Sequence, residues 1–141
     1  LSPRTYRESV APYSRLVAQR VAGAVSPVTG ECAPLIHFGT GSAPILADMA
    51  EVGADCVGVD WKTDLSWAVT QVPGKAVQGN LDPALLQAPW NIIEQAVRDI
   101  LDAGRSASGH VFNLGHGVPP TTDPDVLTRI VELVHELGDE R

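Results

Sequence analysis

Four short apolar runs recur along the chain, and each is followed by glycine or polar residues and then by a stretch with helical spacing. The runs begin near residues 35, 56, 76 and 110, so successive starts are separated by 21, 20 and 34 residues. Short, nearly uncharged runs are typical of strands that are buried on both faces of a parallel sheet. These separations fit crossover helices and leave no room for tight hairpins. The pattern therefore predicts an α/β fold in which parallel strands alternate with helices.

Helical spacing also precedes the first apolar run. Ser2 is a common helix N-cap residue, and Pro3 suits the first helical turn. Apolar residues then recur every three or four positions as far as Val21, so we expect one helix that ends before Gly23. Further helices are expected over residues 43–52 and 64–69, from residues 82 and 89 onward, and over residues 123–137.

Four strand–helix units with a leading helix amount to half of a (β/α)₈ barrel, whose whole length is about 250 residues. We therefore interpret residues 1–141 as the C-terminal half of such a barrel. An open, doubly wound sheet is the structural alternative. Against it, no G-x-G-x-x-G or Walker A sequence follows the first strand, and the glycines at residues 39–41 are typical of a simple turn.

Composition excludes several classes of protein. Hydrophobic residues make up 44% of the 141 residues and charged residues 19%, which argues against a disordered chain. A net charge of −7 argues against a nucleic-acid binder, and no apolar run approaches the ~20 residues that a membrane span needs. Cys32 and Cys56 form no disulfide framework and no CxxC metal motif, so we expect two buried thiols in a reducing cytoplasm.

Polar or glycine residues follow each predicted strand. In a barrel these positions lie on the face that carries the active site. The candidate site residues are Asp60, Gln78, Asn80, Gly115, His116 and Gly117. His116 is the strongest of them, because its glycine neighbours would let a ligand approach the backbone closely. For Asp60 two roles stay open, lining the site or orienting a loop, whereas Trp61 is interpreted as a packing residue near the mouth.

Three stretches carry a resemblance to a known family. They are residues 56–61 (CVGVDW), 77–83 (VQGNLDP) and 109–117 (GHVFNLGHG). In this order and at these spacings they resemble uroporphyrinogen decarboxylase, and the resemblance covers essentially the whole chain and matches the C-terminal portion of that family. Since residue 1 is leucine, we also expect the chain to be the later part of a longer protein.

The resemblance implies a cytoplasmic, homodimeric (β/α)₈ enzyme of porphyrin biosynthesis, a carbon–carbon lyase. Its reaction removes the four acetate carboxylates of uroporphyrinogen III to give coproporphyrinogen III, without metal or cofactor, because the protonated pyrrole accepts the electrons. The family's arginine-rich loop and its Asp, Tyr and Ser or Thr contacts precede this segment. What carries over is the substrate-binding histidine, which corresponds to His116. We therefore expect no catalytic residue here, and an inactive chain unless the N-terminal half of the barrel completes it.

Two alternatives remain open at this stage. Methyltransferases of the same superfamily bind zinc through a His-x-Cys near the first strand here and a Cys after the last. This chain has Ile36-His37-Phe38-Gly39 and Gly115-His116-Gly117 at those places, and neither contains Cys. The second alternative is a non-catalytic half barrel that acts in assembly, because open strand edges need a partner.

Overall fold

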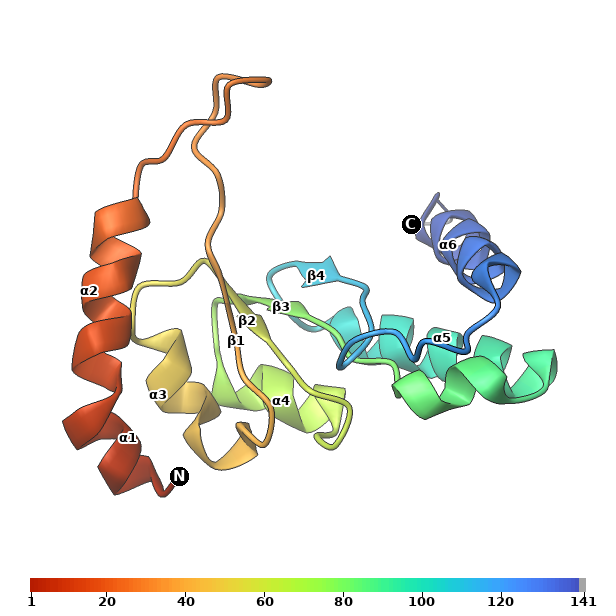
Figure 1. The fold of residues 1–141 in the computed structure, drawn as a ribbon, viewed down its shortest axis with the longest axis horizontal. Helices are drawn as coiled ribbons and strands as arrows, with labels where there is room; N and C mark the ends of the chain where they lie inside the picture. Colours follow the sequence, from red (N-terminus) through yellow and green to blue (C-terminus); the bar gives the residue numbers. More distant parts are fainter. Residues whose placement is uncertain (140–141) are drawn as a thin grey trace.

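The computed structural model describes residues 1–139, so residues 140 and 141 of the predicted domain lie outside the described residues. Its four strands are β1 (Ile36–Phe38), β2 (Cys56–Gly58), β3 (Ala76–Gln78) and β4 (His110–Val111). They form one sheet in the order β1-β2-β3-β4, and every pair is parallel (Figure 1). Each strand pairs with the next one along the chain. A doubly wound sheet reverses its order at a switch point, so this order favours the barrel alternative.

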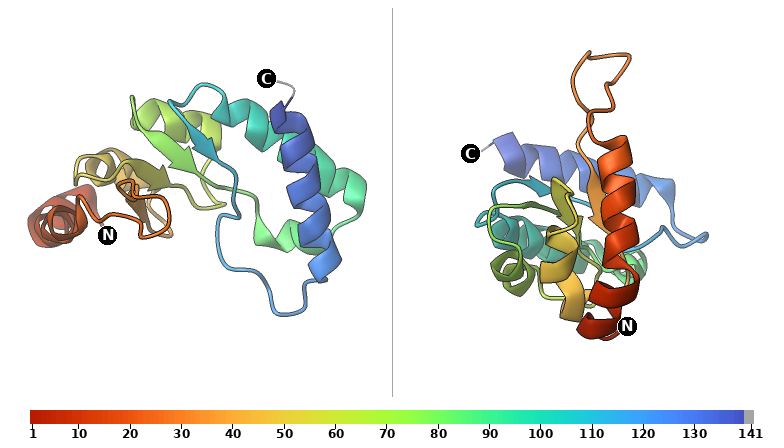
Figure 2. Two further views of the ribbon diagram at one scale, coloured as in Figure 1. Left: turned by 90° about the horizontal axis from the view of Figure 1, so that it is seen from above. Right: turned by 90° about the vertical axis from the view of Figure 1, so that its left-hand side faces the viewer.

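Helices precede, connect and follow the strands. The α-helices are α1 (Pro3–Ser9), α2 (Ala11–Val21), α3 (Leu46–Ala50), α4 (Leu65–Gln71), α5 (Trp90–Gly104) and α6 (Pro124–Asp139), and the 3₁₀ helices are η1 (Ala43–Ile45) and η2 (Pro83–Gln87). Figure 2 shows α4 and α5 along one side of the sheet. No helix in the described part of the chain is both long and apolar enough to cross a membrane.

The register separates a helix-covered face of the sheet from an open face. Val57 and Val77 are adjacent in the sheet, and both are fully buried in a cluster with residues of α3 and α4. The next residue in each strand points to the other side. There Phe38, Gly58, Gln78 and Val111 form one row across the sheet, and Phe38 and Val111 are exposed. The open face is the side that would line the interior of a barrel.

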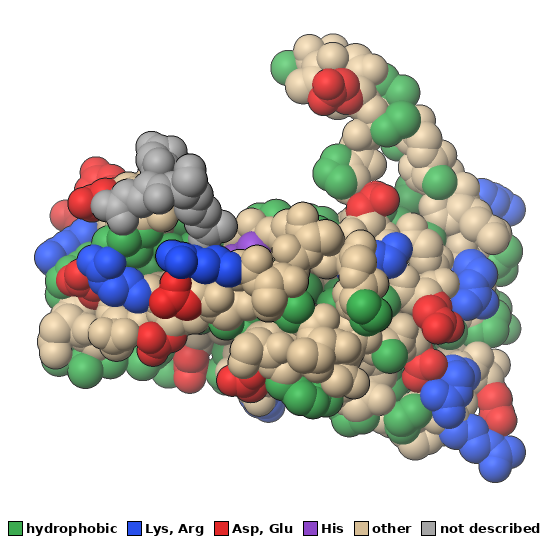
Figure 3. Space-filling model, turned by 180° about the vertical axis from the view of Figure 1, so that it is seen from behind, with side chains coloured by type: hydrophobic (Ala, Val, Ile, Leu, Met, Phe, Trp, Pro, Cys, Tyr) green, Lys and Arg blue, Asp and Glu red, His purple; other side chains and the backbone are tan. Residues whose placement is uncertain are grey.

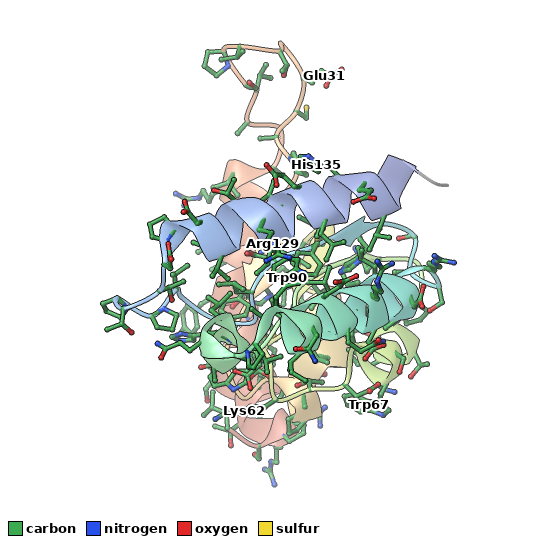
Figure 4. All side chains as sticks on the ribbon, turned by 90° about the vertical axis from the view of Figure 1, so that its right-hand side faces the viewer. Glu31, Lys62, Trp67, Trp90, Arg129 and His135 are labelled. Carbon is green, nitrogen blue, oxygen red and sulfur yellow. The ribbon has the colours of Figure 1, made fainter. Side chains whose placement is uncertain are left out.

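A second apolar cluster joins α5 and α6. Ile93, Val97 and Leu101 of α5 are buried against Ile130 and Leu133 of α6. Between the same helices, the guanidinium of Arg129 lies 3.7 Å from the centre of the Trp90 ring (Figure 4). The ring face attracts the cation, which adds a specific contact to the apolar packing and helps to fix α6 beside α5.

The first helix differs from the prediction. Ser2 caps it as expected, its hydroxyl accepting a hydrogen bond from Thr5 N–H at 3.1 Å. The predicted single helix is nevertheless two helices, because the chain leaves helical geometry at Val10 and α2 begins again with Pro12 in its first turn. Proline lacks the N–H that would continue the hydrogen bonding of α1, so the helix restarts there.

The segment between α2 and β1 was not anticipated. It is a protruding hairpin arm, residues 22–35, with an antiparallel bridge between Val25 and Cys32 (Figures 1 and 3). Between the four strands there is no hairpin, as predicted, because all of them are parallel. Cys32 lies on the arm and is exposed, which corrects the prediction of two buried thiols, whereas Cys56 is buried as predicted. Burial raises the pKa of the Cys56 thiol.

Candidate functional site

The carboxyl ends of the four strands lead into four loops at one edge of the sheet. They comprise residues 39–42, 59–64, 79–82 and 112–123. Since the strands are parallel and in sequential order, the loops are neighbours in the order of the strands. The hairpin arm precedes β1 and lies at the opposite end of the strands. Glu31 on the arm and Lys62 in the second loop mark these two ends in Figure 4.

Asp60 is fully buried, and its carboxylate is occupied by backbone and side-chain donors. One oxygen accepts from Gly41 N–H of the first loop. The other accepts from Lys62 N–H at 3.1 Å and from the Thr63 hydroxyl at 3.0 Å. This geometry supports the loop-orienting role of Asp60 rather than direct contact with a ligand, because its acceptor positions serve the protein's own loops.

Asn80 performs a similar task from the third loop. Its buried side-chain amide donates to the carbonyl of Asp60 at 2.9 Å and to the carbonyl of Thr63 at 2.6 Å. The second and third loops are therefore tied together by one side chain. Gln78 lies earlier, at the end of β3, half-buried on the open face of the sheet. Of these two candidates, Gln78 has the side chain that faces the open interior.

The fourth loop packs tightly on the second at a glycine. Gly115 is buried, and a Cβ added there would lie 2.7 Å from Cα and Cβ of Trp61. Its N–H donates to the carbonyl of Leu81 at 2.8 Å, which joins the fourth loop to the third. Gly117 differs, because a Cβ at that position would meet nothing within 4 Å. Gly115 is thus required by close packing, whereas Gly117 lies in open space.

His116 is exposed between these two glycines. Its ring centre is 5.3 Å from the ring centre of Trp61, and the planes meet at 71°, an edge-to-face contact. Such contacts contribute about 0.5–1.5 kcal/mol beyond burial and hold the ring in a defined place. The imidazole is therefore positioned by Trp61 and remains accessible to a ligand at the carboxyl-end edge.

Lys62 is a candidate that the sequence reasoning missed. Its ammonium lies 4.9 Å from the centre of the Trp61 ring, so Lys62 and His116 contact the same indole. Trp61 is also more than the packing residue it was predicted to be. A signal was present in the sequence, since Lys62 is the only Lys or Arg in the four loops.

Asp64 ends the second loop and caps α4. Its carboxylate accepts from the Ser66 hydroxyl at 2.5 Å and from Trp67 N–H at 2.7 Å. The Ser66 hydrogen bond, followed by that of Trp67, lowers the pKa of this carboxyl. The cap fixes the start of α4, and with it the exit of the loop that carries Lys62.

His37 and His110 lie in the strands, in the same row as Val57 and Val77 on the helix-covered face of the sheet. His37 faces the helices, with Nδ1 3.4 Å from the carbonyl oxygen of Met49. His110 is half-buried, with Nε2 2.8 Å from the carbonyl oxygen of Gly79. Among the side chains that the structure describes, no three His, Cys, Asp or Glu residues gather as metal ligands would. The described residues thus offer no ligand set of the kind that the zinc-binding alternative requires.

Comparison with known proteins identifies the family. The model of the family described as uroporphyrinogen decarboxylase (URO-D) matches residues 1–137. The chain belongs to this family. The resemblance read from the three sequence stretches is therefore confirmed. The matched range includes all four loops of the candidate site.

Several curated relatives bear the name uroporphyrinogen decarboxylase. The protein from Salinispora tropica is 55% identical over 97% of this chain, which corresponds to 35% of the relative. That from Arthrobacter sp. is 53% identical over 93% of this chain and 38% of the relative, and that from Streptomyces coelicolor is 54% identical over 96% and 36%. The chain thus spans little more than a third of the length of these relatives.

A solved structure shares the fold. It is a methyltransferase from Methanosarcina mazei, with a TM-score of 0.77 and 21% identity, and the match covers 97% of this chain and 38% of that one. At this identity the likeness bears on the fold alone. Together with the parallel, sequentially ordered sheet, it confirms the predicted α/β fold of part of a barrel.

Proposed function

We propose that this chain forms the C-terminal portion of a uroporphyrinogen decarboxylase, which converts uroporphyrinogen III to coproporphyrinogen III. Family membership and relatives of that name at more than 50% identity support the proposal. The observation that carries the chain's own part is the exposed imidazole of His116, held against Trp61 at the carboxyl-end edge of a parallel sheet. That edge is where barrel enzymes bind their substrates.

In this reaction the main role of the chain is to bind and position the substrate. Each decarboxylation breaks one carbon–carbon bond, releases CO₂ and adds one proton to the remaining methylene carbon, which becomes a methyl group. The protonated pyrrole takes up the electron pair and loses its ring proton again when the methyl group forms, so the substrate supplies its own electron sink and no cofactor is proposed. His116 hydrogen-bonds or pairs with a substrate carboxylate and thereby orients the macrocycle. Gln78, Gly115 and Gly117 support the same subsite, and Asp60 and Asn80 hold its loops.

The remainder of the enzyme is proposed to cover the two open edges of the sheet. Ile36 and Phe38 on β1 and Val111 on β4 are exposed. An apolar cavity of about 500 Å³ lies between α2 and β1, and another of about 280 Å³ lies between α6 and the loop that follows β4. Since the relatives are nearly three times as long, an N-terminal half barrel is the occupant we propose for both edges.

A homodimer in the cytoplasm completes the proposal, with no nucleic-acid or membrane partner. The net charge of −7 supports the exclusion of nucleic acid. Sedimentation of the active protein would test the dimer, because a species of monomer mass that retains full activity would remove it from the proposal.

The test of the activity joins this chain to the preceding portion of the Salinispora tropica relative, at the position equivalent to Leu1. The fusion and the 141-residue chain alone are each supplied with uroporphyrinogen III, and coproporphyrinogen III is measured. We expect turnover by the fusion and none of useful rate by the chain alone. The fusion with His116→Ala should lose at least about tenfold in kcat/KM, or roughly 1.4 kcal/mol, whereas Arg20→Met, on α2 and outside the four loops, should retain activity.

Other outcomes would change the assignment. Measurable turnover by the chain alone would overturn the view that catalytic residues are missing from it. A folded fusion without activity would favour the alternative of a non-catalytic assembly module. Circular dichroism and sedimentation of each protein would establish that a loss of activity is not a loss of folding.

A further inference from the structure

We propose that Lys62 is a carboxylate-binding residue of the substrate site and acts together with His116, which contacts the same Trp61 ring. This inference rests on the proposed function, because it assigns a second contact to the same polycarboxylate ligand. Lys62 is exposed in the second loop, and its ammonium lies over the Trp61 ring whose other contact is the His116 imidazole. The cation and the imidazole therefore flank one indole.

Lys62 differs from the other cationic residues in its position relative to the candidate site. The chain carries 10 Lys and Arg against 17 Asp and Glu, yet its proposed ligand carries eight carboxylates. Lys62 is the only one of the ten cations in the four loops. The ion pairs of the described residues involve four arginines, at positions 4, 7, 98 and 105, and none involves Lys62. Its ammonium is thus free of carboxylate partners at the edge where an anionic ligand would arrive.

The backbone that carries Lys62 is fixed on both sides. Lys62 N–H donates to Asp60, whose carboxylate also accepts from Thr63 and from the first loop. Asn80 binds the carbonyls of Asp60 and Thr63, which flank Trp61 and Lys62 in the sequence. A loop held in this way presents the lysine without first having to be ordered by the ligand, which favours binding.

The three side chains together suit a particular chemistry. The Trp61 indole lies under the Lys62 ammonium and meets the His116 ring at 71°, so one aromatic side chain holds both polar groups close together. An ammonium and an imidazole that contact the same indole can each meet a carboxylate on a short substituent of one ligand. The group bound by Lys62 is therefore a carboxylate attached to a flat ring, either an acetate or a propionate side chain of the macrocycle.

Binding of uroporphyrin, the flat oxidised octacarboxylate, by the two-part fusion protein tests the inference. Porphyrin fluorescence gives the dissociation constant at several salt concentrations. Lys62→Met keeps the aliphatic stem over Trp61 but removes the charge, so we expect binding to weaken roughly three- to tenfold, with a smaller salt dependence. Lys62→Arg should bind within about twofold of the unsubstituted fusion. Arg20→Met, which removes one charge from exposed α2, should change nothing.

The outcomes separate the inference from the function on which it rests. If the fusion binds uroporphyrin and His116→Ala weakens it while Lys62→Met does not, the role of Lys62 is refuted and the function stands. If the unsubstituted fusion does not bind, the proposed function fails as well. Coproporphyrin, which lacks the acetates, identifies the group. An equal Lys62→Met effect on both porphyrins assigns a propionate, and an effect on uroporphyrin alone assigns an acetate. Unfolding midpoints of all variants exclude a merely structural cause.

Discussion

Replacing Gly115 by alanine adds one methyl group at the most crowded point between the candidate loops. The new Cβ would lie 2.7 Å from Cα and Cβ of Trp61, where carbon atoms in contact are normally about 3.5–4 Å apart. The opposing atoms include main chain, so they cannot turn away as a flexible side chain would. The fourth loop must therefore move away from the second, and the His116–Trp61 contact must weaken with it.

Overpacking of this kind costs about 1–3 kcal/mol of folding free energy. For a chain of this size, that corresponds to a fall of roughly 4–12 °C in the unfolding midpoint. The assay is urea or thermal unfolding followed by circular dichroism, with Trp fluorescence as a second probe because Trp61 lies at the clash. Gly117→Ala is the matched control. It adds the same methyl group two residues away, where nothing lies within 4 Å, and should change stability by less than about 0.5 kcal/mol.

Equal stability of the two alanine variants would refute the reasoning, because it would mean that the fourth loop does not press on the Trp61 backbone. If Gly115→Ala lowers stability but the fusion still binds uroporphyrin normally, the clash between the fourth loop and Trp61 is supported. The same result would show that the position of His116 does not depend on that packing.

Three further predictions concern other parts of the same edge and of the sheet. Asn80→Ala removes the donor of the Thr63 carbonyl and leaves the Asp60 carbonyl with only the long hydrogen bond from Thr63 N–H at 3.3 Å, so it should cost about 1–3 kcal/mol in urea unfolding, with altered Trp fluorescence. Because the pKa of Asp64 is lowered in the folded protein, its carboxylate stabilises the fold at pH values above the pKa of the unfolded chain, near 4. This stabilisation is lost as the pH falls through the lower pKa of the folded state. Asp64→Asn should therefore reduce the pH dependence of the unfolding free energy in that acidic range. A thiol reagent should modify Cys32 rapidly and Cys56 only after denaturation, with the two sites distinguished by peptide mass; equal rates would contradict the burial of Cys56.

The fold was predictable because the apolar runs and the glycines after them are local signals with a direct structural meaning. The run at residues 56–59 is buried on both faces of the sheet, and its neighbours follow in sequence order. Breaks inside helices were harder to predict. Val10 and Tyr13 satisfy the apolar spacing of a continuous helix, and the missing N–H of Pro12 breaks it between them. The hairpin arm could not be predicted because it is held by a single antiparallel bridge, Val25 with Cys32, which leaves no alternating pattern in the sequence.

The site was predictable in its location and only partly in its roles. Strand ends are visible in the sequence, and His116 between two glycines is a local feature. The assignments of Asp60 and Asn80 depend on which backbone groups lie near them, and those groups come from other loops. Lys62 could have been found by counting cations within the four loops alone. The asymmetry between Gly115 and Gly117 could not, because it depends on the Trp61 backbone across the loop boundary.

The four loops form a connected set before any ligand is present. The first is joined to the second through Gly41 and Asp60, the second to the third through Asn80, and the third to the fourth through Leu81 and Gly115. Every one of these links ends on a backbone group, so polar side chains that make them are no longer available to a ligand. His116 and Lys62 make none of these links through their side chains. In the four loops, the residues that hold the loops together are therefore different from the residues that would bind the ligand. Removal of the Asn80 side chain should lower the stability of the fold, whereas removal of the Lys62 charge should lower only the affinity for the ligand.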